Sequence, residues 1–82
     1  VHEVLTPEEL MPRAVEIAEM IGANAPLAVQ GTKAVTQFWR RYGLEESLQF
    51  TATVGDRVLS SEDALEGPKA FSEKRPPVWQ GR

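Results

Sequence analysis

The chain contains few side chains that could transfer protons or bind a metal. His2 is the only histidine and there is no cysteine, so His2 has no second imidazole and no thiolate with which to share a metal ion. Two pairs of acids, Glu45-Glu46 and Glu62-Asp63, are neighbours in sequence, and neighbouring side chains on a helix diverge. We interpret His2 as an exposed residue and both acid pairs as complements to the positive end of a helix dipole. The sequence therefore predicts no catalytic residue and no metal ligand in this chain.

An aromatic residue and a cation near the end of the chain form the most informative pair. Phe71 and Lys74 are three residues apart, a spacing that puts both on one face of a continuous helix. An aromatic ring beside an ammonium group could bind a ligand that carries an adenine and phosphates. Cations near a helix C-terminus also complement the helix dipole, so the spacing alone leaves a structural role open for Lys69, Lys74 and Arg75.

A second aromatic group lies in the middle of the chain. Phe38, Trp39 and Tyr42 flank Arg40 and Arg41. Stacking on nucleic-acid bases would suit such a group. However, the formal net charge of -3 and the pI near 5.1 argue against a nucleic-acid-binding protein, which has a concentrated basic surface. We therefore expect these aromatic residues to anchor a core or a subunit interface.

The start of a first helix is the clearest of the elements that must position these residues. Thr6 is the expected N-cap, Pro7 takes the first helical position and Glu9 completes a capping box. Leu5 and Leu10 are placed as a hydrophobic staple across this start. An apolar stripe follows at three- and four-residue spacing until a Gly-Ala-Asn-Ala-Pro segment ends the helix.

Three further helices are expected. The second runs from Pro26 to a C-cap at Gly43, and Gly31 in its middle predicts the close approach of another backbone segment. The third spans about Leu44 to Leu59. The fourth begins after Ser61 as N-cap and stops before a Pro-Pro pair, and a Gly-Pro pair in its middle predicts a bend or an interruption. The predicted fold class is all-α, with three to four short helices.

The size and composition indicate one small globular piece that packs against another body. A chain of 82 residues and 9.1 kDa is at most one domain, at a size where a single core is marginal. Residues 1–5 alternate like the end of a strand, and the chain begins with Val1, so we expect a piece of a longer polypeptide. The lack of cysteine fits a reducing cytoplasm, and neither a signal peptide nor a membrane span is predicted.

Two segments resemble the carboxyl end of one enzyme family. Residues 61–67 (SEDALEG) and 70–79 (AFSEKRPPVW) resemble the S-E-D-A-x-E-G-x-x-A-F-x-E-K-R-x-P-x-[FW] ending of the enoyl-CoA hydratase/isomerase, or crotonase, superfamily. Residues 24–28, followed by Thr32-Lys33, are similar to a segment of that family at the expected distance upstream. With residues 1–10 the resemblance covers essentially the whole chain. It is specific for the superfamily and not for one member.

The resemblance implies that residues 1–82 are the C-terminal helical region of a crotonase-like subunit whose N-terminal ββα spiral core lies outside this chain. Such a region covers the active site and builds a homotrimer, or a hexamer made of two trimers. The implied activity is that of an enoyl-CoA hydratase, a cytoplasmic lyase of fatty acid metabolism that adds water to a 2-enoyl-CoA. An enoyl-CoA isomerase or another crotonase-fold CoA enzyme is the alternative. The catalytic groups belong to the N-terminal core, so this chain alone is expected to be inactive.

The resemblance also implies a binding role for the end of the chain. Phe71 and Lys74 match the aromatic residue and the lysine that approach the adenine and phosphates of CoA bound mainly to a neighbouring subunit. No cofactor is implied beyond the coenzyme A of the substrate thioester. The chain departs from the family pattern at Pro68, where a helix-compatible residue is usual, and at Gly55, where some members carry a larger apolar residue facing the acyl pocket.

A stand-alone helical protein-interaction module is the alternative from another class. Its partner would bind the face formed by Phe38, Trp39 and Tyr42. This alternative requires the chain to be complete and to fold independently, and a native mass of 9.1 kDa would favour it.

Overall fold

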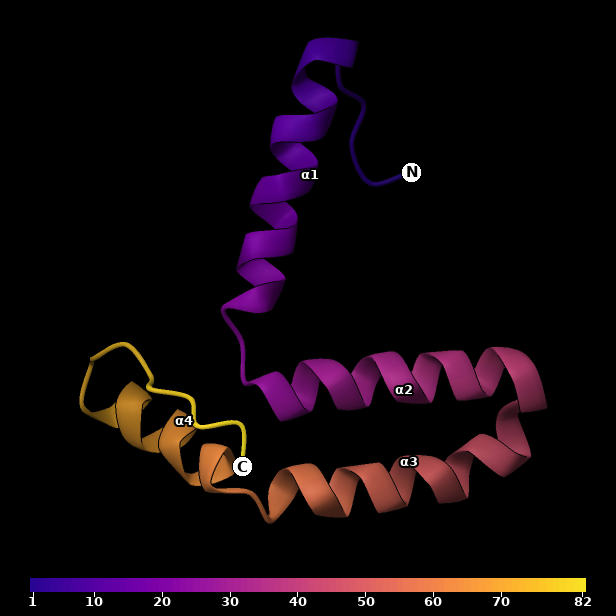
Figure 1. The fold of residues 1–82 in the computed structure, drawn as a ribbon, viewed down its shortest axis with the longest axis vertical. Helices are drawn as coiled ribbons and strands as arrows, with labels where there is room; N and C mark the ends of the chain where they lie inside the picture. The colour runs from indigo at the N-terminus through magenta and orange to yellow at the C-terminus, as the bar shows by residue number, and fades with distance from the viewer.

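The computed structural model describes all 82 residues as four α-helices with no strand (Figure 1). The helices are α1 (Pro7–Gly22), α2 (Pro26–Tyr42), α3 (Leu44–Leu59) and α4 (Glu62–Ser72). The predicted all-α fold class and the predicted starts of all four helices are confirmed. Residues 1–5, which were expected to resemble the end of a strand, form no strand. None of the helices is long and apolar enough to cross a membrane.

α1 is held at both ends by side chains. The Glu9 carboxylate accepts hydrogen bonds from the backbone N–H (3.0 Å) and the hydroxyl (2.9 Å) of Thr6, which ties the start of the helix as predicted. At the other end the Asn24 side-chain amide donates to two carbonyl oxygens of the last turn, at 2.9 and 3.1 Å. The N-terminal segment runs back beside α1 (Figure 1), and the Arg13 guanidinium holds it by two short contacts to Glu3, of 2.7 and 2.9 Å.

α2 and α3 form an antiparallel hairpin, side by side in Figure 1. The turn between them is Gly43, whose φ of 89° favours glycine. A close approach at Gly31 is confirmed, but it is made by side chains and not by the backbone that was predicted. A Cβ atom there would lie 2.8 Å from Cγ1 of Val54 and 3.4 Å from Cγ2 of Val58, so it is the side chains of α3 that require the glycine.

The aromatic residues at the turn end of the hairpin differ from the predicted set. Phe38 stacks on Phe50 of α3 with 4.4 Å between ring centroids, and it also packs against Tyr42 at 4.5 Å. The Arg41 guanidinium lies 5.4 Å from the centre of the Tyr42 ring. Trp39, which was expected in this group, is 53% exposed and belongs to none of these pairs. Tertiary packing across the hairpin therefore selects Phe50 in place of Trp39.

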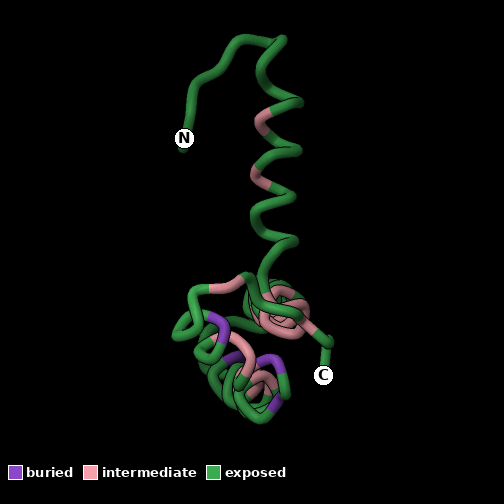
Figure 2. Tube along the Cα trace, turned by 90° about the vertical axis from the view of Figure 1, so that its left-hand side faces the viewer, coloured by how far each residue is buried: buried purple, intermediate pink, exposed green.

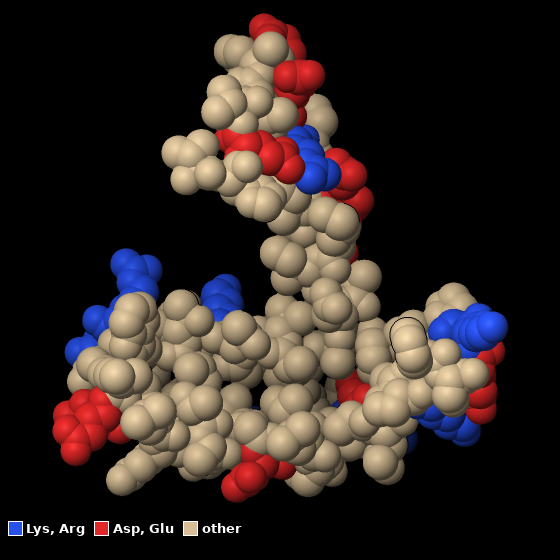
Figure 3. Space-filling model, turned by 180° about the vertical axis from the view of Figure 1, so that it is seen from behind, with Lys and Arg blue, Asp and Glu red and all other residues tan.

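The molecule is flat and open. It measures 42 × 40 × 17 Å, and its radius of gyration is 15.9 Å, whereas a compact domain of this length has about 12 Å. α1 projects away from the other three helices in both views (Figures 1 and 2). Ala70 is the only apolar residue that is fully buried, and large apolar side chains remain about half exposed along α1. Figure 3 shows charged side chains gathered toward the outer ends of one face, with a broad uncharged surface between them. Such surfaces are typical of regions that pack against another protein body.

α4 corrects two further predictions. The helix runs without interruption through Gly67 and Pro68, where a bend or break was expected. Proline removes one hydrogen bond from a helix interior and crowds the residue before it. Because that residue is a glycine without a Cβ atom, the crowding is relieved. The helix then ends at Ser72, earlier than the Pro-Pro pair that was expected to stop it.

Candidate functional site

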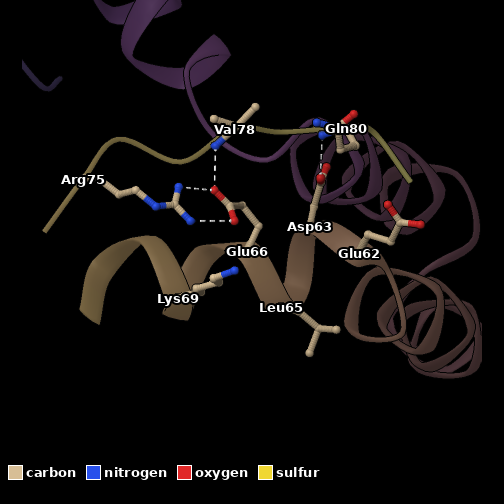
Figure 4. A pocket seen from close by; sticks show the side chains of 8 residues that line it. All are labelled: Glu62, Asp63, Leu65, Glu66, Lys69, Arg75, Val78 and Gln80. Atoms are coloured by element: carbon tan, nitrogen blue, oxygen red, sulfur yellow. Dashed lines mark hydrogen bonds and ion pairs between the residues drawn. The ribbon is translucent and has the colours of Figure 1, made fainter. Parts of the chain in front are cut away.

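The candidate site is formed by α4 and by the seven residues after Arg75, which fold back along the helix (Figure 4). Ser61 starts the helix, since its hydroxyl accepts a hydrogen bond of 3.2 Å from the backbone N–H of Ala64. Residues spaced three and four positions apart form one face of the helix, and the returning tail packs against this face. We call this arrangement the tail clamp, formed by Asp63, Glu66, Gly67, Arg75 and Trp79.

Asp63 is the most buried ionisable residue of the chain, with 2% of its surface exposed. One carboxylate oxygen accepts the backbone N–H of Gln80 at 2.7 Å, and the other accepts that of Gly81 at 2.9 Å. Its own N–H donates to the carbonyl oxygen of Arg82 at 3.2 Å. The sequence identified Asp63 only as an acid in the first turn of a helix. The structure adds that its carboxylate ties the end of the chain to that turn.

Glu66 makes the second link to the tail. Its two carboxylate oxygens accept hydrogen bonds from Nη1 and Nη2 of Arg75 at 2.6 and 3.0 Å, and one of them also accepts the backbone N–H of Val78 at 2.8 Å (Figure 4). The Glu66 side chain is 18% exposed. The hydrogen bonds from Arg75, followed by that from Val78, lower the pKa of Glu66 to about 2. Arg75 also donates through Nε to Glu73 at 2.5 Å, and both acids raise the pKa of the guanidinium above its usual range.

Trp79 connects the tail to the rest of the molecule. Its indole N–H donates to the carbonyl oxygen of Ala23 at 2.9 Å, at the junction of α1 and α2. A Cβ atom on Gly67 would lie 3.6 Å from the Trp79 ring, so the indole packs directly over this glycine. Through Trp79 the clamp therefore joins α4 to Ala23, which lies 56 positions before Trp79 in the chain.

Phe71 and Lys74, the predicted ligand-binding pair, lie at the C-terminal end of α4. Phe71 belongs to the last turn, and 87% of its surface is exposed. Lys74 lies beyond the helix, so the two residues do not share one face of a continuous helix as the spacing suggested. Instead, the N–H of Lys74 donates to the carbonyl oxygen of Phe71 at 3.2 Å and the N–H of Arg75 to that of Ala70 at 3.1 Å. This is a Schellman turn, and Lys74 occupies its left-handed position with a φ of 53°.

A hollow of about 490 Å³ lies between α4 and the tail (Figure 4). Its lining residues are Glu62, Asp63, Leu65, Glu66, Lys69, Arg75, Val78 and Gln80. Most of the charged groups in it are paired with one another or with tail amides, so it belongs to the clamp. Phe71 and Lys74 do not line it. No group of three or more histidine, cysteine, aspartate or glutamate side chains is placed to hold a metal ion.

Comparison with known proteins finds relatives along the whole of this chain. The chain is 44% identical over 85 aligned residues to a carnitinyl-CoA dehydratase of Salmonella arizonae, an alignment that covers 99% of this chain and 33% of that protein. It superposes over its whole length on a solved enoyl-CoA hydratase/isomerase of Mycobacterium paratuberculosis, with a TM-score of 0.84, 44% identity and 32% of that chain covered. These matches are consistent with a C-terminal segment of the crotonase superfamily.

A second solved structure agrees with this assignment. An enoyl-CoA hydratase of Mycobacterium tuberculosis matches all of this chain with a TM-score of 0.86 and 34% identity, and 32% of its own chain is covered. The chain spans about a third of the length of the curated relatives it matches. No protein-family profile matches it. Residues 61–79 carry the family resemblance. Within this segment, most of the side-chain hydrogen bonds to distant parts of the chain are made by residues of the tail clamp.

Proposed function

We propose that this chain is the C-terminal helical region of an acyl-CoA-processing enzyme, and that the intact protein is an enoyl-CoA hydratase, which adds water to the double bond of a 2-enoyl-CoA. The observation that carries the proposal is the superposition of this whole chain on an enoyl-CoA hydratase/isomerase (TM-score 0.84, 44% identity) and on an enoyl-CoA hydratase (TM-score 0.86, 34% identity). The name of the Salmonella arizonae relative supports a second candidate, a carnitinyl-CoA dehydratase.

We assign no reaction step to the residues of this chain. In the proposed enzyme the N-terminal ββα core supplies the backbone N–H groups that stabilise the thioester oxyanion and the acids that transfer the proton. The helical region covers that core and forms the contacts of a trimer or of a hexamer. The half-exposed apolar residues of α1 and the open, flat shape support such packing.

Phe71 and Lys74 are the proposed CoA-binding residues. They emerge from two ends of one hydrogen-bonded turn, where the aromatic ring is exposed and the ammonium group makes no ion pair. An exposed ring suits stacking on an adenine, and an unpaired ammonium suits a phosphate. No cofactor is proposed beyond coenzyme A itself. A cytoplasmic location is part of the proposal and is supported by the bacterial acyl-CoA enzymes among the relatives.

Hydration of crotonyl-CoA by the intact protein tests this function. We expect the intact protein to turn over crotonyl-CoA, measured as a decrease in the absorbance of the enoyl thioester. The 82 residues alone should show no turnover. If the intact protein neither hydrates 2-enoyl-CoA nor dehydrates carnitinyl-CoA, the proposed reaction is wrong. If the native protein instead has a mass of 9.1 kDa and does not bind CoA, the stand-alone interaction module is favoured.

A further inference from the structure

We propose that Glu66 is a positioning residue for coenzyme A, because through Arg75 it holds Lys74 in the left-handed turn that presents the Lys74 ammonium group at the end of α4. This inference rests on the proposed function, since it takes Lys74 as the cation that meets the CoA phosphates. It assigns to Glu66 a role in ligand affinity in addition to its role in the clamp.

The conformation of Lys74 is the first observation. Its φ of 53° is the only positive φ among the non-glycine residues, at a position where helices usually carry glycine. A residue with a Cβ atom remains in this region only when its surroundings determine it. Here the two hydrogen bonds of the turn close over Ala70, the one fully buried apolar residue.

The side chains on either side of Lys74 are the second observation. All three nitrogen atoms of the Arg75 guanidinium have partners: Nη1 and Nη2 bind Glu66, and Nε binds Glu73. Nη1 also donates to the carbonyl oxygen of Pro76 at 3.2 Å. The neighbours of Lys74 are therefore tied to each other and, through Glu66, to the middle of α4.

Lys74 itself is left free by this arrangement. Its side chain makes no hydrogen bond to protein and no ion pair, although two acids, Glu66 and Glu73, lie nearby in the chain. Both acids are occupied by Arg75, so neither competes for the Lys74 ammonium group. The geometry thus provides an unpaired cation on a fixed backbone, and a fixed backbone lowers the entropy lost when an anion binds.

The test is a double-mutant cycle on the intact protein, with free coenzyme A as the probe and its Kd measured by calorimetry. Since a hydrogen bond between charged groups contributes about 1.5–3 kcal/mol, we expect Lys74→Ala to weaken binding by about tenfold or more. Glu66→Gln is expected to weaken binding by about fivefold, because the neutral amide cannot hold the guanidinium by two charged bonds. In the Lys74→Ala background, Glu66→Gln should have no further effect, because the residue through which it acts is gone.

Matched variants separate positioning from general damage. Glu62 lies on α4 like Glu66, and Glu62→Gln removes only its exposed ion pair with Arg82 in the tail. This variant should leave the Kd for coenzyme A unchanged. Arg75→Lys keeps the charge but loses the planar fork, so it should weaken binding as Glu66→Gln does, with the same helical content by circular dichroism. This second variant tests the proposal if Glu66→Gln does not fold.

The outcomes are distinguishable. A wild-type protein that does not bind coenzyme A overturns the proposed function and this inference with it. If Lys74→Ala weakens binding while Glu66→Gln and Arg75→Lys do not, the proposed function stands and the positioning role is wrong. Additive effects of Glu66→Gln and Lys74→Ala would also overturn it, since they would show that Glu66 acts independently of Lys74.

Discussion

Replacement of Asp63 by alanine should release the end of the chain from α4. Asp63 is 2% exposed, and its two oxygens hold the N–H groups of Gln80 and Gly81 at 2.7 and 2.9 Å. Hydrogen bonds to charged groups contribute about 1.5–3 kcal/mol each. Because both donor residues lie near the surface and can bond to water once released, we take the lower value for each, which gives about 3 kcal/mol for the pair.

Hydrogen exchange of the Gln80 and Gly81 amides measures this energy directly. A loss of about 3 kcal/mol corresponds to exchange that is faster by about 100-fold in Asp63→Ala than in the wild type. The control is Glu62→Ala, whose exposed pair with Arg82 should change the exchange by less than about threefold. Exchange in Asp63→Ala that stays within threefold of the wild type would refute the role assigned to this carboxylate.

Three further predictions concern stability of the intact protein. Gly31→Ala should lower the midpoint of thermal unfolding, because a Cβ atom would meet a valine methyl group at 2.8 Å. Gly55→Ala has nothing within 4 Å of the new Cβ atom and should gain up to about 1 kcal/mol of helix stability. A shift of the unfolding midpoint that is equal in both variants would contradict this reasoning. Lys74→Gly should raise stability by about 1 kcal/mol in denaturant titration, because glycine adopts a positive φ without strain, while CoA affinity falls. Glu66 has a folded pKa of about 2, below its ordinary value of 4.5, so its contribution is present above pH 4.5 and is lost as the pH falls toward 2. Trp79 fluorescence should change between pH 4.5 and 2 in the wild type, as the contribution of Glu66 to stability is lost. The same change with pH should be weaker in Glu66→Gln.

The helices were largely predictable because their ends depend on local residues. Thr6, Pro7 and Ser61 specify helix starts through local effects, and the structure begins α1 at Pro7, directly after Thr6, and α4 directly after Ser61. Gly43 is likewise a local signal for the turn of the hairpin. The C-terminal end of α4 was not predictable in this way, because Lys74 occupies a turn position where the usual signal is glycine.

The contacts of the candidate site depend on residues far apart in the chain. Asp63 meets amides 17 and 18 positions later, and Trp79 reaches a carbonyl oxygen 56 positions earlier. The periodicity of a helix or a strand cannot predict contacts between residues this far apart. The sequence therefore identified these residues through a family resemblance and not through their contacts. The spacing of Asp63, Glu66 and Ala70, three and four residues apart, was the available signal that one face of α4 is covered. Phe50 was missed for the same reason, since its partner Phe38 lies on the other arm of the hairpin.

A crystal structure of the intact protein with coenzyme A bound is the sharpest test of the proposed CoA-binding role of Phe71 and Lys74. We expect the Lys74 ammonium group to lie within ion-pair distance, about 4 Å, of a CoA phosphate. The Phe71 ring should contact the adenine, with the bidentate pair of Glu66 and Arg75 intact. A bound coenzyme A from which Phe71 and Lys74 of every subunit point away would contradict it.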